Sequence, residues 1–304
     1  MRSFQDIKNT IHPIASLMTP GMWRVWASTV FLSLNGVCIK LASEHAHVMQ
    51  IVTVRSFLGL LLCIASAKGN IQSLFGRNKL LLSVRGVLGM FAMIATFTAF
   101  SILPVAEATV IFFVNPVLVA LLAWLVLGEK VGLIGGVSVL VCFGGVLLVA
   151  QPSFFFESGG SLPFMGVVSA LVGACFSAGA MVTVRALGHK EIALSPVFYL
   201  NLCTFVGTVY FAIQDWVWGS WELWLILIAI GVLTHFGQYF MTRGLAMETA
   251  GRGSAVGYFQ IVFAIIWGVL FFSELPNLLA LIGAVFIFLG TLGLRDRPKG
   301  APNS

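Results

Sequence analysis

The stretch NPVLVALLAWLVLGE at residues 115–129 returns 145 residues later as QIVFAIIWGVLFFSE at residues 260–274. Each copy is an apolar run that opens with an amide side chain and ends with a glutamate. An internal repeat of this kind predicts two structurally equivalent halves. Further pairs keep the same spacing: Lys40 with Arg185, Gly86-Val87 with Gly231-Val232, Asn115 with Gln260, Val117 with Val262, and Glu129 with Glu274.

The composition is that of a membrane protein. Hydrophobic residues make up 59% of the 304 residues and charged residues 9%, and the mean hydropathy is +1.01, whereas soluble domains have about 25% charged residues. The apolar runs are apolar on every face, which excludes barrel strands, and are long enough to cross about 30 Å of hydrocarbon as helices. The sequence therefore predicts an all-α polytopic membrane protein. Its ten predicted transmembrane helices are Trp23–Ala42, Val48–Ala67, Leu80–Phe100, Val105–Leu127, Val131–Ala150, Phe164–Leu187, Leu194–Ile213, Trp221–Leu245, Gly253–Phe272 and Asn277–Leu294.

Five helices separate equivalent positions, and an odd number turns the second half upside down. The ten helices therefore form two inverted five-helix repeats, related by an axis in the membrane plane. The segment Met1–Gly21 lacks a signal-peptide cleavage pattern and fits a short interfacial helix or a tail equally well. The predicted division is a cytoplasmic N-terminal segment at 1–22, a first repeat at 23–150, an outer loop at 151–163, a second repeat at 164–294 and a cytoplasmic tail at 295–304.

The basic residues give the orientation. Of the 17 Lys and Arg residues, 14 fall in segments on the side of both termini, and the outer loops hold none. Short cytoplasmic loops retain basic residues, so both termini are predicted to be cytoplasmic, in a multi-pass protein of the bacterial inner (plasma) membrane. Because this bias accounts for most of the net charge of +6, no nucleic-acid partner is expected. The lipid bilayer and a small-molecule substrate are the expected partners.

Polar side chains within the spans are candidates for a substrate path, because hydrocarbon disfavours them unless they face a cavity or a partner. Asn115 and Gln260 hold the same repeat position, which predicts a shared site of two amides about the axis. The alternative is that each amide joins two neighbouring helices. The candidate substrate-binding residues are Asn35, Arg55, Asn115, Asn201, His235, Tyr239, Tyr258 and Gln260.

The remaining three of the 17 basic residues, Lys40, Arg55 and Arg85, fall inside predicted helices 1, 2 and 3. Arg55 either pairs with Glu107 or holds the carboxylate or phosphate of a substrate, and its repeat partner is the neutral Leu200. Lys40 and Glu107 are a candidate charge pair or gate at the outer end. Lys40 lies near its helix end and is also able to extend its side chain to the outer membrane surface. Arg85 is expected to extend to the inner membrane surface in the same way.

The polar inventory also bears on mechanism. No Asp or Glu lies near the middle of a predicted span, and no Walker-type loop is present, which leaves facilitated diffusion, exchange, or proton coupling through His235. His235 equally fits a hydrogen bond to a neighbouring helix. Pro116 is interior to its helix and predicts a kink beside Asn115.

The sequence offers little for chemistry. The five histidines are scattered, and the five cysteines contain no Cys-x-x-Cys, so neither a metal site nor a cofactor is expected. A membrane-embedded enzyme is the remote alternative. The glycines of the last helix, Gly283, Gly290 and Gly293, fit packing within the monomer or a homodimer through helix 10.

The segment 115–129 followed by LIGG at 133–136, and its copy at 260–274, resemble the helix 4 to helix 5 signature of the drug/metabolite transporter superfamily, in its EamA-type branch. Lys40 and Arg55 also resemble positions favoured in that group. The resemblance implies a central cavity lined mainly by helices 1 to 4 and 6 to 9, with helices 5 and 10 at the periphery.

The same resemblance implies a secondary transporter that works by alternating access. Its substrate would be a small polar or amphipathic organic metabolite, such as an amino acid, a vitamin or a nucleotide-like compound such as S-adenosylmethionine. A multidrug or metabolite exporter of the same fold is the alternative.

Overall fold

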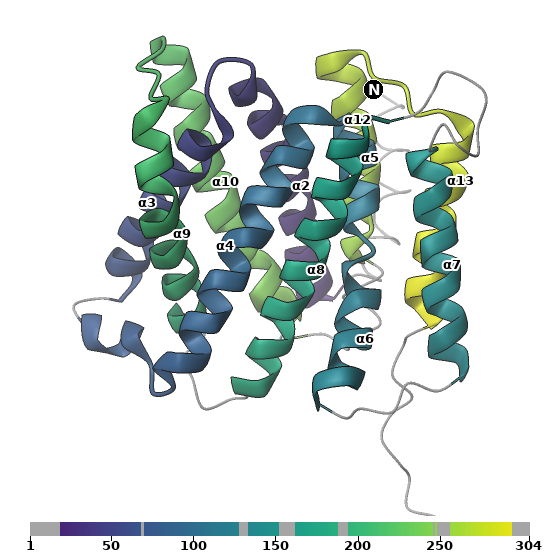
Figure 1. Cartoon of the computed structure of the whole chain (residues 1–304), viewed down its shortest axis with the longest axis horizontal. Helices are drawn as coiled ribbons and strands as arrows, with labels where there is room; N and C mark the ends of the chain where they lie inside the picture. The colour runs from purple at the N-terminus through teal and green to yellow at the C-terminus, as the bar shows by residue number, and fades with distance from the viewer. Residues whose placement is uncertain are drawn as a thin grey trace, which may run out of the picture.

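The computed structural model describes residues 19–67, 70–127, 133–151, 162–187, 194–245, 247 and 256–293. Within these ranges the chain is helical and contains no strand, and the helices stand side by side in one bundle (Figure 1). The helices are α2 (Pro20–Ser43), α3 (Val48–Ser66), a 3-10 turn η1 (Ile71–Phe75), α4 (Lys79–Ile102), α5 (Val105–Phe112), α6 (Asn115–Leu127), α7 (Leu133–Ala150), α8 (Phe164–Leu187), α9 (Leu194–Gln214), α10 (Trp221–Leu245), α12 (Phe259–Phe272) and α13 (Leu278–Gly293).

These helices account for the ten expected spans. Among the described residues, seven stretches are long and apolar enough to cross a membrane, and shorter apolar helices at Leu140–Val149, Phe259–Phe272 and Leu278–Leu289 supply the other three. The prediction of an all-α, multi-pass membrane protein with ten helices in two inverted repeats is confirmed. The tail at 295–304, and most of the N-terminal segment at 1–22 and of the outer loop at 151–163, lie outside the described residues.

Local sequence signals start several helices. The Thr19 side chain accepts a hydrogen bond from Met22 N at 3.3 Å, and Pro20 occupies the first turn of α2. Asn78 caps α4 by accepting from Leu81 N at 3.1 Å. Such caps satisfy backbone N–H groups that the first helical turn leaves without a partner. Beyond the caps, the hydrocarbon of the bilayer favours helices, because it offers no hydrogen-bond partners and every backbone N–H and C=O group must bond within the chain.

The fourth span is broken where Pro116 predicts a kink. α5 ends at Phe112 and α6 begins at Asn115, so the predicted kink is confirmed. In the 145-residue register Phe113 corresponds to Tyr258, and Tyr258 also interrupts its helix, just before α12. The rings of Phe113 and Tyr258 pack with centroids 5.0 Å apart. The broken helices of the two repeats therefore meet at equivalent residues.

Helix packing follows the repeat. α4 packs on α8 and α10 packs on α2, while α12 packs on α2 and α6 packs on α8. In the register α2 corresponds to α8, α4 to α10 and α6 to α12. Each contact thus has its symmetry-related counterpart, which places the halves about a pseudo-two-fold axis.

The peripheral pair α7 and α13 pack against each other through glycines (Figure 1). A Cβ at Gly145 would lie 2.7 Å from the Gly283 carbonyl oxygen, and a Cβ at Gly283 would lie 2.6 Å from that of Gly145. Both positions therefore require glycine for this close approach. Gly283 serves packing within the monomer, and the homodimer through helix 10 stays a prediction.

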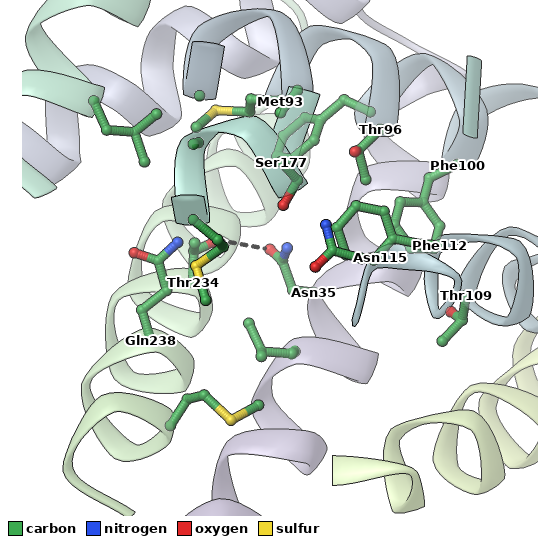
Figure 2. A pocket seen from close by; sticks show the side chains of 18 of the residues that line it. Asn35, Met93, Thr96, Phe100, Thr109, Phe112, Asn115, Ser177, Thr234 and Gln238 are labelled. Atoms are coloured by element: carbon green, nitrogen blue, oxygen red, sulfur yellow. Dashed lines mark hydrogen bonds between the residues drawn. The ribbon is translucent and has the colours of Figure 1, made fainter. Parts of the chain in front are cut away.

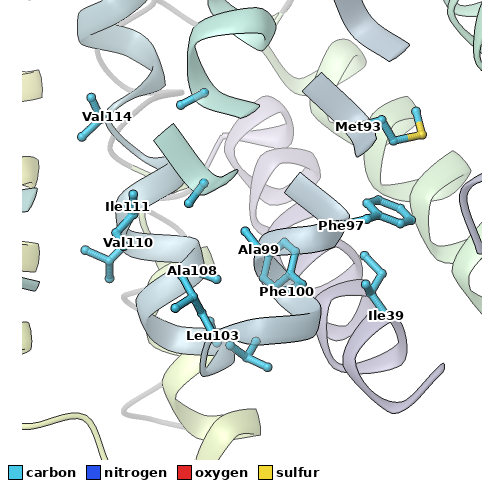
Figure 3. Packing of buried hydrophobic residues seen from close by; sticks show 14 of the residues in the cluster. Ile39, Met93, Phe97, Ala99, Phe100, Leu103, Ala108, Val110, Ile111 and Val114 are labelled. Carbon is cyan, nitrogen blue, oxygen red and sulfur yellow. The ribbon is translucent and has the colours of Figure 1, made fainter. Parts of the chain in front are cut away.

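Apolar side chains fill the bundle where α4 turns into α5 (Figure 3). Leu103 and Ile111 are fully buried there, and Ile39 of α2 is 1% exposed. Lys40 and Glu274 lie at the same end, which is called the Lys40 end below. The bundle is thus closed at this end by close packing.

Candidate functional site

A cavity of about 380 Å³ lies between the two repeats, within the range of roughly 300–1,000 Å³ that small-molecule sites occupy. Its lining residues come from α2, α3, α4, α5, α6, α8, α9, α10 and α12. Among the described residues, α7 and α13 contribute none. The cavity therefore lies where the family resemblance implies, with the fifth and tenth helices outside it.

The cavity is symmetric in position. Seven pairs of lining residues are separated by 145 positions, so both members of each pair reach the same space from opposite repeats. These pairs are Leu32 and Ser177, Asn35 and Ala180, Arg55 and Leu200, Gly89 and Thr234, Met93 and Gln238, Thr96 and Met241, and Asn115 and Gln260.

The same cavity is asymmetric in chemistry. In six of the seven pairs one member is polar and the other is apolar or glycine, and the polar member comes from the first repeat in three pairs and from the second in the other three. Asn115 and Gln260 are polar on both sides. The two repeats thus present different polar groups to the cavity, apart from the two amides of Asn115 and Gln260.

Asn35 and Asn115 each make one hydrogen bond to another helix. Thr234 Oγ1 of α10 donates to Asn35 Oδ1 of α2 at 3.1 Å, and Asn115 Nδ2 donates to the Ala174 carbonyl of α8 at 3.0 Å. Figure 2 shows Asn35, Ser177 and Asn115 reaching toward one space. These asparagines thus join helices, as the alternative reading expects, and also line the cavity.

Arg55 is 5% exposed and lines the cavity from α3. Its Nη1 lies 3.1 Å from Asn201 Oδ1 and 3.1 Å from Met93 Sδ. Among the described residues no ion pair joins Arg55 to an acid. The predicted alternative of an Arg55–Glu107 pair is therefore wrong, because Asn201, held close by Gly59, is the side chain within reach.

Arg85 does not snorkel, contrary to expectation. It lines the cavity, and its Nη1 lies 2.5 Å from where a Cβ on Gly89, one turn deeper in α4, would stand. Its Nε and Nη1 are buried without a hydrogen-bond partner among the described residues. Gly89 leaves the space along α4 that lets the guanidinium turn inward.

Asn201 and Tyr258 are buried but stand outside the cavity lining. Asn201 lies behind Arg55 and also donates to the Val197 carbonyl at 3.0 Å. Tyr258 packs edge to face on Phe288, with centroids 4.8 Å apart. Asn201 thus positions the lining residue Arg55. Tyr258 packs against its neighbours at the break just before α12.

His235 and Tyr239 are not brought to the cavity either. The structure turns another face of α10 inward, that of Thr234, Gln238 and Met241. Tyr239 is 50% exposed and carries Arg243 over its ring at 5.6 Å. The sequence-based reading favoured His235 because it titrates, but helical spacing places Gln238 on the lining face.

Lys40 pairs with Glu274 and not with Glu107. Lys40 Nζ also donates to the Leu103 carbonyl at 3.2 Å, and Glu274 Oε2 accepts from Val105 N at 3.1 Å. The pair thus ties α2 and the end of α12 to the turn between α4 and α5. In the register it corresponds to Arg185 and Glu129; the side chain of Arg185 and all of Glu129 lie outside the described residues.

Glu107 lies within electrostatic reach of both Lys40 and Glu274. It is 8% exposed, and its Oε2 has no hydrogen-bond partner among the described residues. It is a neighbour of the ion pair, and the acid bound to Lys40 is Glu274.

The cavity is closed toward the Lys40 end. There the lining residues Ile39, Phe100 and Thr109 are 1%, 8% and 2% exposed. Close packing of these side chains thus closes the cavity on the side of the Lys40–Glu274 pair.

Comparison with known proteins agrees with this architecture. The family model of the EamA-like transporter family matches residues 19–151 and again residues 164–295. One solved crystal structure superposes with a TM-score of 0.63 at 17% sequence identity, over 90% of this chain and 96% of that protein. That likeness shows the fold.

Several relatives are named as transporters. The pseudopaline exporter CntI of Pseudomonas aeruginosa is 32% identical over 91% of this chain and 95% of its own length. Solute carrier family 35 member G1 of Homo sapiens is 29% identical over 91% of this chain and 79% of its own. The S-adenosylmethionine uptake transporter of Rickettsia prowazekii is 25% identical over 87% of this chain and 88% of its own.

Proposed function

The chain belongs to the EamA-like transporter family, within the drug/metabolite transporter superfamily, and on that premise we propose that it carries a small polar or amphipathic organic metabolite across its membrane by alternating access. The observation that carries this proposal is the cavity on the pseudo-two-fold axis, lined by seven register pairs. Inverted-repeat carriers place their substrate at the repeat interface.

Asn35, Arg55, Asn115 and Gln260 are the proposed substrate-contacting residues, because all four line this cavity. Asn115 and Gln260 would bind the substrate through amide groups that both sides of the axis supply. Asn201 would act through Arg55. His235 and Tyr239 are left out of the proposed site because they lie off the lining.

The Lys40–Glu274 pair is the proposed gate. It spans α2, the end of α12 and the turn between α4 and α5, next to the buried Ile39 that lines the cavity. Access from the Lys40 end requires these segments to separate. In the proposed cycle the pair holds in the present state and breaks when the cavity opens to that end.

The proposed setting is a bacterial inner membrane with both termini cytoplasmic, so that the Lys40 end faces outward. Transport as a facilitator or an exchanger is consistent with the lining, whereas proton coupling would run through His235, which lies off it. We further propose that the protein is not an enzyme; its named relatives are transporters. Import and export use the same site, and the exporter alternative differs only in direction.

Cells that produce the chain test the proposal. Metabolites inside the cells and in the medium are measured by mass spectrometry for cells making the wild type and for cells making Asn115→Ala/Gln260→Ala at equal membrane abundance. We expect the wild type to redistribute at least one small organic metabolite severalfold. The double variant should lose about fivefold to 150-fold of that activity, since each of the two lost amide contacts costs about 0.5–1.5 kcal/mol. Identical distributions in both would contradict the proposal.

A further inference from the structure

The charges that line the cavity are all of one sign. Among the described lining residues, the ionisable side chains are Arg55 and Arg85, and none is acidic. Charged groups within a membrane domain are costly unless something compensates them. The neighbours of Arg55 are the neutral Asn201 and Met93, and Arg85 Nε and Nη1 have no partner among the described residues.

Both guanidinium groups border one wall of the cavity. Arg85, Gly89 and Met93 follow one another at four-residue spacing along α4, and all three line it. Arg55 Nη1 contacts Met93 Sδ. A Cβ on Gly89 would meet both Arg85 Nη1 and the Leu200 side chain, and Leu200 precedes the Asn201 that holds Arg55. The two cations therefore flank the same stretch of α4 and α9.

Two glycines make room for the polar side chains of this wall. Gly89 gives Arg85 the room to turn inward, and Gly59 gives Asn201 the room to reach Arg55, since a Cβ there would lie 2.5 Å from Asn201 Oδ1. The repeat partners of Arg55 and Arg85 are Leu200 and Ile230, so the positive charge belongs to the first repeat alone among these positions.

We propose that the transported metabolite is an organic anion whose carboxylate or phosphate group binds between Arg55 and Arg85. This inference rests on the proposed function and narrows its substrate class. Guanidinium groups donate several N–H groups in a planar array that suits such oxyanions. The neutral part of the substrate lies toward Asn115, Gln260 and the rings of Phe112 and Phe113, which line the rest of the cavity.

The test uses the purified full-length protein and probes matched in size but not in charge. Succinate is compared with succinamide and uridine monophosphate with uridine, and choline, which has no carboxylate or phosphate, serves as the cationic probe. Binding is measured as thermal stabilisation against ligand concentration. We expect an anionic member to bind at least about tenfold more tightly than its neutral counterpart. The dicarboxylate and monophosphate arms distinguish the two kinds of oxyanion.

Three variants test whether anion binding depends on Arg55 and Arg85. Arg55→Gln and Arg85→Gln are expected to weaken anion binding about tenfold or more. Gly89→Ala keeps both charges but displaces the Arg85 guanidinium, and it should weaken binding in the same direction even where an arginine variant fails to fold. Gly144→Ala, which has nothing within 4 Å of its added Cβ, and Arg24→Gln, outside the lining, are the matched controls and should bind as the wild type does.

Equal or tighter binding of the neutral or cationic probes, binding of no probe, or unchanged anion binding in folded Arg55→Gln and Arg85→Gln would overturn the inference. Transport of a neutral or cationic metabolite would overturn it as well while leaving the carrier proposal standing. Failure to move any metabolite would instead overturn the proposed function itself.

Discussion

Loss of the Lys40–Glu274 pair should open the cavity toward the Lys40 end. Both side chains are about four-fifths buried, with exposures of 17% and 20%, so the pair lies between surface ion pairs, worth about 0.2–1 kcal/mol, and buried ones, whose disruption costs about 3–5 kcal/mol. Lys40→Met removes the charge-assisted contact with Glu274 and the hydrogen bond to the Leu103 carbonyl. The loss of the first alone should destabilise the closed state by about 1.5–3 kcal/mol. The ratio of open to closed molecules rises by about tenfold to 150-fold.

Cysteine accessibility measures this shift. Thr109 lines the cavity and is 2% exposed, so Thr109→Cys, in a background without the five native cysteines, reacts with a membrane-impermeant maleimide only when the Lys40 end opens. We expect the labelling rate from that side to rise in Lys40→Met by the same tenfold to 150-fold. Lys79→Met, which removes the exposed lysine at the start of α4, is the matched control.

A double-mutant cycle separates the pair from its surroundings. Lys40→Met and Glu274→Gln together should open the cavity little more than either change alone, because both remove the same interaction. Labelling rates that stay within twofold of the control in Lys40→Met, or that add fully in the double variant, would refute a gate built on this pair.

Three further outcomes follow from the packing and the site. Gly145→Leu should lower the melting temperature by several degrees relative to Gly144→Ala, because the new side chain would push against the Gly283 carbonyl and Ile287 at a cost of about 1–3 kcal/mol; unchanged melting would contradict the α7–α13 contact. Asn201→Asp should place a carboxylate against Arg55 and weaken anion binding more than Asn201→Ala does, which a titration of both variants would reveal. His235→Gln should transport at the wild-type rate in a vesicle uptake assay, because His235 does not line the cavity; a large loss would point to proton coupling.

The sequence predicted the fold because its main signals are global. Ten apolar runs and the 145-residue register require helices in two inverted halves, and the register also predicts which positions meet, since seven of its pairs line the cavity. Pro116 predicted the break between α5 and α6. The corresponding break at Tyr258 has no proline and was not predicted.

The site was predicted less completely because it depends on which face of each helix turns inward. Arg85 lies near its helix end, where snorkelling is the default, and only the room at Gly89 turns it inward. The sequence suggested Glu107 as the partner of Lys40. In the structure Glu274 is the partner, and it also accepts a hydrogen bond from Val105 N in the turn between α4 and α5. Thr96 and Ser177 carry small hydroxyl groups that give hydropathy almost no signal, and neither was predicted as a site residue, yet the structure places both in the lining.

Metabolite uptake by reconstituted vesicles tests the central claim most directly. Vesicles containing the purified wild type, vesicles containing Asn115→Ala/Gln260→Ala and vesicles without protein are incubated with a filtered cell extract, and the contents of their lumen are quantified by mass spectrometry. If the cavity on the pseudo-two-fold axis carries substrate, at least one small organic metabolite accumulates in the wild-type vesicles and falls severalfold or more in the double variant. Equal lumen contents in wild-type and protein-free vesicles, or in wild-type and double-variant vesicles, would contradict it.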